Sequence, residues 1–118
     1  MPEPEPIQVS PLELWRRLHA TQNHFADLLH EVSEIRREYE RLRAHPTALA
    51  VDGLGPAVDP VKTTDAVLHG LEQTTGGLQS AHDRLESTRA DHAMRLKLTD
   101  AAARELGQRR QRRATRSR

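Results

Sequence analysis

The chain contains no cysteine in its 118 residues and very few aromatic side chains. The absence of cysteine excludes disulfides and every metal site that is built on thiolates. Trp15, Phe25 and Tyr39 are the only aromatic residues, so a core has to be built mainly from leucine, valine and alanine. Such a core is thin, and an extended helical chain with a thin core gains further burial by associating with other chains.

Long hydrophobic runs are also missing from the sequence. No window approaches the roughly 20 apolar residues that a membrane-spanning helix needs, and the first residues, MPEPEPIQV, are acidic and proline-rich where a secretory signal has a basic start and an apolar run. We therefore expect a soluble, cytoplasmic protein. Residues 1–10 hold three prolines and two glutamates in their first six positions, and we expect them to form a disordered acidic arm.

Positive charge comes almost entirely from arginine, since the chain has sixteen arginines and two lysines. The net charge is only +1, but the two signs are unevenly distributed. Residues 104–118 contain seven arginines and one glutamate, a net charge of +6, whereas residues 1–103 contain eleven basic and sixteen acidic residues, a net charge of −5. The sequence therefore describes an acidic body with a basic end.

A first helix is predicted over about residues 11–45. Ser10 and Glu13 have the spacing of a capping box, and Pro11 suits the first helical position. Pro46 ends the helix because it disfavours the helical conformation of the residue before it. Within the helix, apolar residues recur in a heptad pattern that places them on one stripe. This stripe is the predicted partner or dimer interface, and it consists of Leu14, Leu18, Phe25, Leu28, Val32, Ile35, Tyr39 and Leu42.

A loop over residues 46–59 is expected to reverse the chain. Together with the proline that follows it, this loop holds two glycines and three prolines and shows no helical period. Asp59 and Pro60 then repeat the signal of a cap followed by proline, which predicts a second helix over about residues 60–106.

The apolar stripe of the second helix is less regular than that of the first. Leu71, Leu78 and Leu85 follow one another at intervals of seven, but His82 and His92 fall on the same stripe. Polar side chains at such positions typically fix the register or the choice of partner. If these histidines pair across an interface, association should depend on pH between about 6 and 7.

Two adjacent glycines, Gly76 and Gly77, leave two architectures open. Inside a helix they cost about 2 kcal/mol relative to alanine, yet the leucine spacing continues across them. The favoured fold is all-α: a long, antiparallel, coiled-coil-like helical hairpin that dimerises into a four-helix arrangement. The alternative is a three-helix bundle with a break at the two glycines.

The basic end is predicted to project from the hairpin. At 1.5 Å per residue the first helix is about 50 Å long and the second about 70 Å, so the second outruns the first from about residue 95. Gly107 is the expected junction with a flexible tail over residues 107–118. The candidate nucleic-acid-binding residues are the arginines of this end, whose guanidinium groups could contact phosphates. They are Arg104, Arg109, Arg110, Arg112, Arg113, Arg116 and Arg118.

No pattern in the sequence indicates catalysis. There is no cysteine nucleophile and no serine in a strand-turn-helix elbow, and the glycines at positions 53 and 55 lack the spacing and the lysine of a phosphate loop. Seven histidines raise the question of a metal site, but the best set of ligands lies on the outward face of the first helix, where bundles do not place them. This set is Asp27, His30, Glu31 and Glu34. We expect no enzyme activity, no cofactor and no metal.

Two functions stay open on the sequence alone. The first is a non-enzymatic helical oligomerisation module whose basic arm contacts nucleic acid, as in a small accessory or regulatory protein. Binding would be mostly non-specific, because the arm has no aromatic residues for stacking on bases and no helix-turn-helix accompanies it. The second is a scaffold that binds a partner helix through the stripe of the first helix, with no nucleic-acid role. We expect the chain to form a homodimer or to bind a helical partner. We do not expect it to bind a membrane or a small-molecule substrate.

Overall fold

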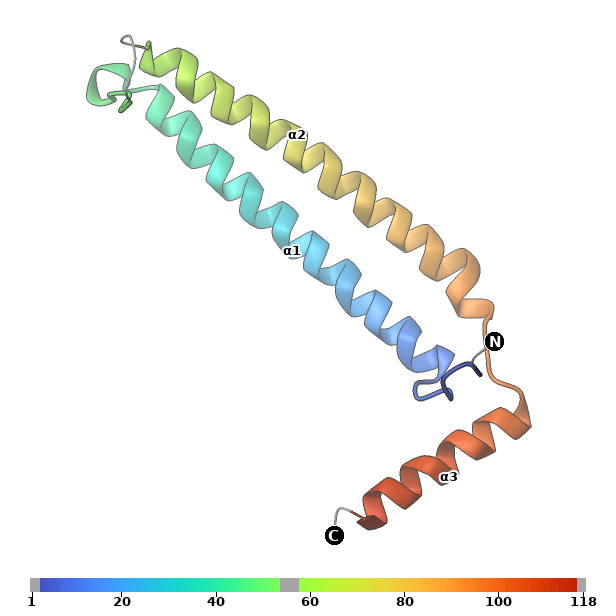
Figure 1. Ribbon diagram of the computed structural model, residues 1–118. Coiled ribbons are helices and arrows are strands. Elements are labelled where there is room, and N and C mark those ends of the chain that lie inside the picture. Colours follow the sequence, from blue (N-terminus) through green and yellow to red (C-terminus); the bar gives the residue numbers. More distant parts are fainter. Residues whose placement is uncertain (1–2, 54–57, 117–118) are drawn as a thin grey trace. The chain divides into compact units, whose positions relative to one another are not determined.

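The computed structural model describes residues 3–53 and 58–116, and these residues form helices and no strands (Figure 1). The all-α prediction is therefore confirmed for the described part of the chain, in which no helix is long and apolar enough to span a bilayer. The three long helices are α1 (Pro11–Arg43), α2 (Pro60–Ser87) and α3 (Asp100–Arg116). Three short helical segments accompany them: η1 (Pro46–Ala48), η2 (Thr88–His92) and η3 (Ala93–Arg95).

The start of α1 is fixed by the predicted reciprocal cap. The backbone N–H of Ser10 donates to Oε2 of Glu13 at 3.0 Å, and the backbone N–H of Glu13 donates to Oγ of Ser10 at 3.2 Å. These two hydrogen bonds satisfy amide groups that the first turn of a helix otherwise leaves unpaired. The helix ends at Arg43, just before Pro46, as the sequence predicts.

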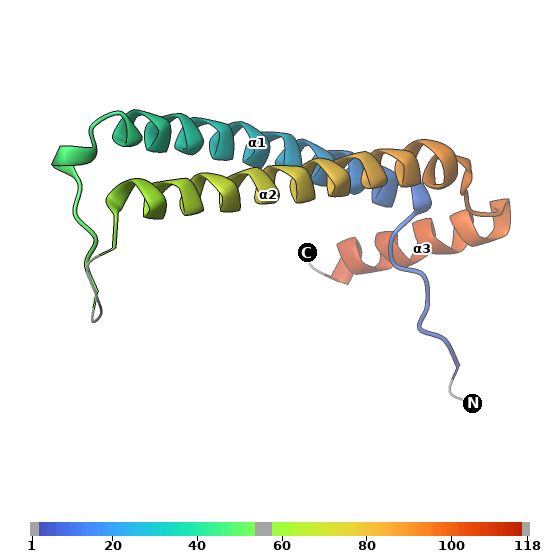
Figure 2. The same cartoon turned by 90° about the horizontal axis from the view of Figure 1, so that it is seen from above.

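The chain divides into two compact units, Gln22–Arg84 and Met1–Thr21 with Leu85–Arg118. In the first unit the two long helices lie side by side and antiparallel (Figures 1 and 2). Nη2 of Arg43 donates to Oδ2 of Asp65 at 3.2 Å, which links the end of α1 to the second turn of α2. This guanidinium lowers the pKa of Asp65 below its usual value.

Helix α1 buries only one of its two predicted apolar rows. Leu18, Phe25, Val32 and Tyr39 are half-buried, whereas the other row stays exposed. The second row of burial lies one residue further along the sequence, which rotates it by about 100° around the helix. It consists of Trp15, Gln22, Leu29 and Arg36. Because Gln22 and Arg36 are polar, the hydrophobic pattern of α1 does not identify this buried row and predicts burial of the row that begins at Leu14 instead.

Helix α2 half-buries the stripe that the sequence predicts, up to Leu85. Thr64 and Thr75 are tolerated there because their hydroxyls donate to the carbonyls of Pro60 at 2.8 Å and Leu71 at 2.9 Å. Besides Pro60 and Val67, the buried and half-buried residues recur at intervals of three and four: Val61, Thr64, Leu68, Leu71, Thr75, Leu78, His82, Leu85 and Arg89. This periodicity runs through the middle of α2 without interruption.

The two adjacent glycines do not break α2, so a chain break at Gly76 and Gly77 is wrong. Both residues are exposed, and a Cβ atom built on either would meet no atom within 4 Å. The packing of α2 therefore holds these positions helical although glycine disfavours the helix.

The predicted single helix over residues 60–106 is wrong beyond Ser87. The chain continues as the π-helical turn η2 and the 3₁₀ turn η3, and then becomes extended at Leu96. The guanidinium of Arg89 already lies over the ring of Trp15, at 5.2 Å from its centroid, near the start of α1 at Pro11. A longer α2 would have no facing helix to pack on, and most helical stability comes from such packing. His92 is consequently exposed.

Helix α3 begins with a capping signal of its own, formed by Thr99 and Asp100. Oγ1 of Thr99 accepts a hydrogen bond from the backbone N–H of Ala102 at 3.3 Å, and Asp100 places an acidic group in the first turn. The helix then passes through Gly107 to Arg116. The expected end of the helix at Gly107 is therefore wrong, because the basic segment is a helix of its own.

We predict that Gly76→Ala and Gly77→Ala each raise the free energy of unfolding by about 1 kcal/mol. Each change adds helix propensity where the added methyl group meets open space. Urea unfolding at one protein concentration measures the effect, and Ala81→Gly on the same exposed helix should lower the free energy by a similar amount. A loss of stability in both alanine variants would contradict the structure, because it would mean that another part of the protein approaches the glycines closely.

Candidate functional site

The basic helix α3 is packed against the N-terminal segment. Leu106 is 7% exposed and is the only buried hydrophobic residue among those that the structure describes. Together with Pro6, Ile7 and Arg109 it lines a small hollow between α3 and this segment. The acidic arm and the basic tail, which the sequence suggested were two free ends, therefore contact each other.

A bidentate ion pair between Arg110 and Glu13 also joins α3 to the first turn of α1. Nη1 and Nη2 of Arg110 donate to Oε1 and Oε2 of Glu13, the second at 2.7 Å, and Nη2 also donates to the carbonyl of Gln8 at 3.0 Å. The guanidinium and the backbone N–H of Ser10 lower the pKa of Glu13 to about 2. Sequence reasoning identified Glu13 only as a cap, since nothing in the pattern indicated which arginine would face it.

Two more of the predicted phosphate ligands have partners within the chain. Arg109 forms an ion pair with Glu105 and donates to the carbonyl of Ile7 at 3.4 Å. Arg104 donates from Nε to the carbonyl of Asp100 at 3.4 Å. Arg118 lies outside the described residues. Arg109 and Arg110 thus connect α3 to the N-terminal residues, whereas the contact of Arg104 lies within α3 itself.

The remaining arginines of α3 lie on one face. Arg112 and Arg116 are exposed, and no other described residue forms an ion pair with either of them. Gln108, Gln111 and Thr115 line a second hollow beside these two arginines. Four arginines within eight residues, which cover about 10 Å of helix, line the adjacent hollow: Arg109, Arg112, Arg113 and Arg116. We call this surface the basic face of α3. Its guanidinium donors and amide groups suit oxyanions such as phosphate.

A second surface of possible function is the row of α1 that α2 leaves uncovered. We call it the exposed row, and it consists of Leu14 (44% exposed), Leu28 (46%), Ile35 (41%) and Leu42 (46%). Within Gln22–Arg84, the only long helix beside α1 in the described part is α2 (Figures 1 and 2). The structure therefore divides the eight predicted interface residues into four that are half-buried and four that are exposed.

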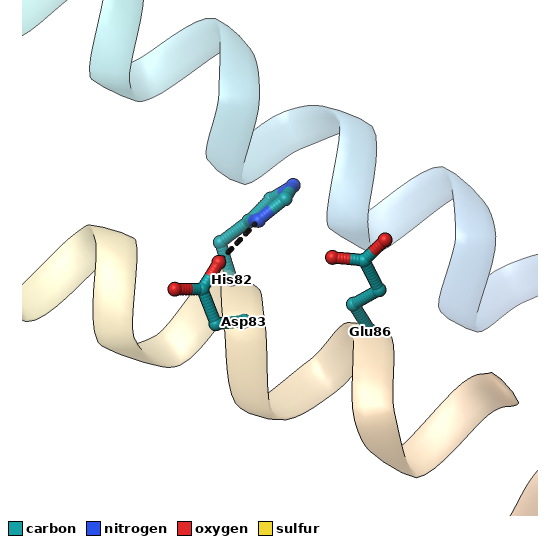
Figure 3. Close-up of side chains that lie close together, drawn as sticks. All are labelled: His82, Asp83 and Glu86. Carbon is teal, nitrogen blue, oxygen red and sulfur yellow. Dashed lines mark hydrogen bonds and ion pairs between the residues drawn. The ribbon is translucent and has the colours of Figure 1, made fainter. Parts of the chain in front are cut away.

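The metal-ligand set considered on the first helix is only partly brought together. Nε2 of His30 lies 3.1 Å from Oε1 of Glu34, in an exposed pair one turn apart. A different set, on α2, has its ligand atoms within 4.8 Å of one another: His82, Asp83 and Glu86. In Figure 3 the imidazole of His82 and the carboxylate of Asp83 approach each other, with Nδ1 and Oδ1 at 3.4 Å, while Glu86 lies one turn further along the helix. Both carboxylates are exposed, as helix-surface acids commonly are without a metal, and we assign no site here.

Comparison with protein-family models finds no match for the chain, and comparisons with curated proteins and with solved structures find none either. The chain is therefore assigned to no family. The function proposed below rests on the exposed row of α1 and the basic face of α3.

We predict that Arg110→Gln raises the pKa of Glu13 from about 2 towards its ordinary value of 4.5, because the carboxylate loses its guanidinium partner. Since the folded pKa is depressed, the ion pair stabilises the attachment of α3 fully above about pH 4.5, and this stabilisation is lost as the pH falls towards 2. A carboxyl NMR titration of Glu13 measures the shift.

Arg112→Gln is the matched control for this titration, because it removes the same charge from the same helix without touching Glu13. It should leave the Glu13 titration unchanged. An equal shift in both variants would show that the overall charge of α3, and not the contact with Arg110, lowers the pKa of Glu13.

Proposed function

We propose that this chain is a non-enzymatic helical association module in which α1 pairs with a further helix. The observation that carries the proposal is the exposed row of α1, four large apolar side chains that stay uncovered while the apolar row beside them is half-buried against α2. The partner helix would cover this row and extend the thin core of the hairpin.

The spacing of the exposed row is what distinguishes it from ordinary surface apolar residues. Single exposed leucines are common on soluble proteins and need no explanation. Here the side chains recur at multiples of seven residues from Leu14 to Leu42, which makes a stripe about 42 Å long. A sustained heptad stripe is typical of a helix–helix contact, and apolar surface that it buries contributes roughly 25 cal/mol per Å².

We further propose that the basic face of α3 contacts the phosphates of nucleic acid. This second role is supported by Arg112 and Arg116, which are exposed and form no ion pair with another described residue. Duplex DNA carries about one negative charge per 1.7 Å of its axis, so a helix face with several guanidinium groups matches it in sign and density. The face holds no aromatic residue, and binding should therefore be largely independent of base sequence.

The alternative is a scaffold that binds the helix of a different protein and has no nucleic-acid role. It uses the same exposed row of α1 and leaves the basic face of α3 as a solvated surface. The two functions differ in whether loss of arginines from α3 affects binding to a polyanion.

We predict that Leu28→Glu disrupts association, because it places a charge in the middle of the exposed row. Sedimentation velocity over a wide range of protein concentration should show self-association of the wild-type chain and about a hundredfold weaker association of the variant. Asn23→Glu is the matched control, since it adds the same charge to an exposed residue on the opposite side of α1. Equal weakening by the control would overturn the role of the exposed row.

We predict that the double variant Arg112→Gln, Arg116→Gln weakens binding to a DNA duplex of arbitrary sequence and lowers the slope of log K against log salt by about 1.8, or about 0.9 for each lost phosphate contact. Fluorescence anisotropy at several salt concentrations measures the slope. The control is Arg16→Gln, Arg37→Gln on α1, which removes the same charge elsewhere. An equal loss of DNA binding in both double variants would show that only the net charge of the protein matters. If the wild-type protein does not bind the duplex, the nucleic-acid role is rejected.

A further inference from the structure

We propose that the exposed row of α1 is covered by α1 of a second copy of this chain, which runs antiparallel and crosses it at Leu28. The inference rests on the proposed function and specifies both the partner and its direction. The order of charges beside the row carries it.

The two ends of the exposed row are equally distant from Leu28, and Ile35 has the polar Thr21 at its mirror position. Leu14 and Leu42 lie two heptads before and after it, so reversal of the helix about Leu28 places Leu14 opposite Leu42 of the second copy. The same reversal places Thr21 opposite Ile35 of the second copy, and Leu28 opposite Leu28 of the second copy. Both ends of the row are then covered, so an antiparallel pair buries the whole stripe.

Two further rows flank the exposed row along α1. On the side towards α2 lies the half-buried apolar row of Leu18, Phe25, Val32 and Tyr39. On the other side lies a polar row whose four residues are all exposed and change in charge along the helix. In chain order it reads Arg17, His24, Glu31 and Glu38. The positive end therefore precedes the negative end.

The direction of pairing decides what each flanking row meets. In an antiparallel pair with two-fold symmetry, a flanking row faces the same row of the second copy in reverse order. Arg17 then lies beside Glu38 of the second copy, and His24 lies beside Glu31. By symmetry each of these contacts occurs twice, and the half-buried apolar row meets its own apolar copy.

A parallel pair has no such match. It sets the polar row of one copy against the apolar row of the other, so that Arg17 and Glu38 lose water without gaining a partner. The change from basic to acidic side chains along the polar row therefore gives matched pairs only in the antiparallel arrangement.

The structure leaves this polar row largely available for such contacts. Among the residues that the structure describes, neither the guanidinium of Arg17 nor the carboxylate of Glu31 takes part in an ion pair, and Glu38 pairs only with Arg41, one turn away on the same helix. The surface of α1 is hollowed around Ile35, between side chains that carry three carboxylates and two guanidiniums. They are Glu31, Glu34, Arg37, Glu38 and Arg41. In the proposed pair, this hollow faces the half of α1 of the second copy that carries Arg17.

Charge reversal tests the pairing. We expect Arg17→Glu and Glu38→Arg each to weaken self-association by about tenfold, since each places like charges opposite one another at two symmetric positions. The double variant Arg17→Glu, Glu38→Arg should restore association to within about threefold of the wild type. Arg16→Glu, which makes the same change on an adjacent exposed residue away from the row, should have little effect. If the double variant self-associates as weakly as expected from adding the losses of the two single variants, the inference is overturned.

Introduced cysteines report the direction independently, because the chain has no cysteine of its own. Leu28→Cys should form a disulfide-linked dimer on mild oxidation. Leu14→Cys alone should not, because its two copies lie about 42 Å apart in an antiparallel pair. A mixture of the Leu14→Cys and Leu42→Cys chains should cross-link. Efficient cross-linking of Leu14→Cys to itself would show a parallel pair and overturn the inference.

The two proposals fail in different ways. A wild-type dimer that Leu28→Glu dissociates, but that cross-links in parallel, would overturn the antiparallel inference and leave association through α1 intact. A wild-type chain that is monomeric at every concentration would overturn the second copy as the partner. A wild-type dimer that Leu28→Glu does not dissociate would overturn association through the exposed row itself.

Discussion

The packing available to each helix is the constraint on which the structure depends. With three aromatic residues and a single buried hydrophobic residue in the described part, no element can be stabilised far from a neighbour. The regular helix α2 ends at Ser87, close to the point where Arg89 covers Trp15 near the start of α1. Beyond it the chain makes its π and 3₁₀ turns and starts α3 with a new cap. The length of α2 is therefore determined more by the length of α1, against which it packs, than by the intrinsic helix propensity of its residues.

The basic end illustrates how intramolecular contacts change the meaning of a charged sequence. As a string, the last residues are uniformly rich in arginine. In the folded chain, Arg109 and Arg110 are occupied by carboxylates and backbone carbonyls, whereas Arg112 and Arg116 face solvent. Arg109 and Arg110 therefore have a structural role, and the proposal about phosphate rests on Arg112 and Arg116.

Local signals predicted the fold well, and contacts between segments far apart in the sequence decided the rest. The Ser10 cap, the proline at position 46 and the seven-residue spacing across Gly76 predicted the start and end of α1 and the continuity of α2. The buried row of α1 was assigned one residue too early, because Gln22 and Arg36 carry no apolar signal. The end of α2 was missed because the segment 88–99 contains neither glycine nor proline, and only the position of α1 makes it end there. The pairing of Arg110 with Glu13 joins residues 97 positions apart, beyond the reach of a periodic pattern.

The carboxylate of Glu13 performs two structural tasks at once. It accepts the backbone N–H of Ser10 at the start of α1 and the guanidinium of Arg110 from α3. These tasks form one linked equilibrium, and linkage is reciprocal. An anion that binds Arg110 in place of Glu13 also weakens the first turn of α1. Conversely, association that stabilises α1 holds Glu13 in position, and Glu13 then competes more strongly with the anion for Arg110. The proposed association of α1 and the proposed binding of anions would therefore be coupled through the side chain of Glu13.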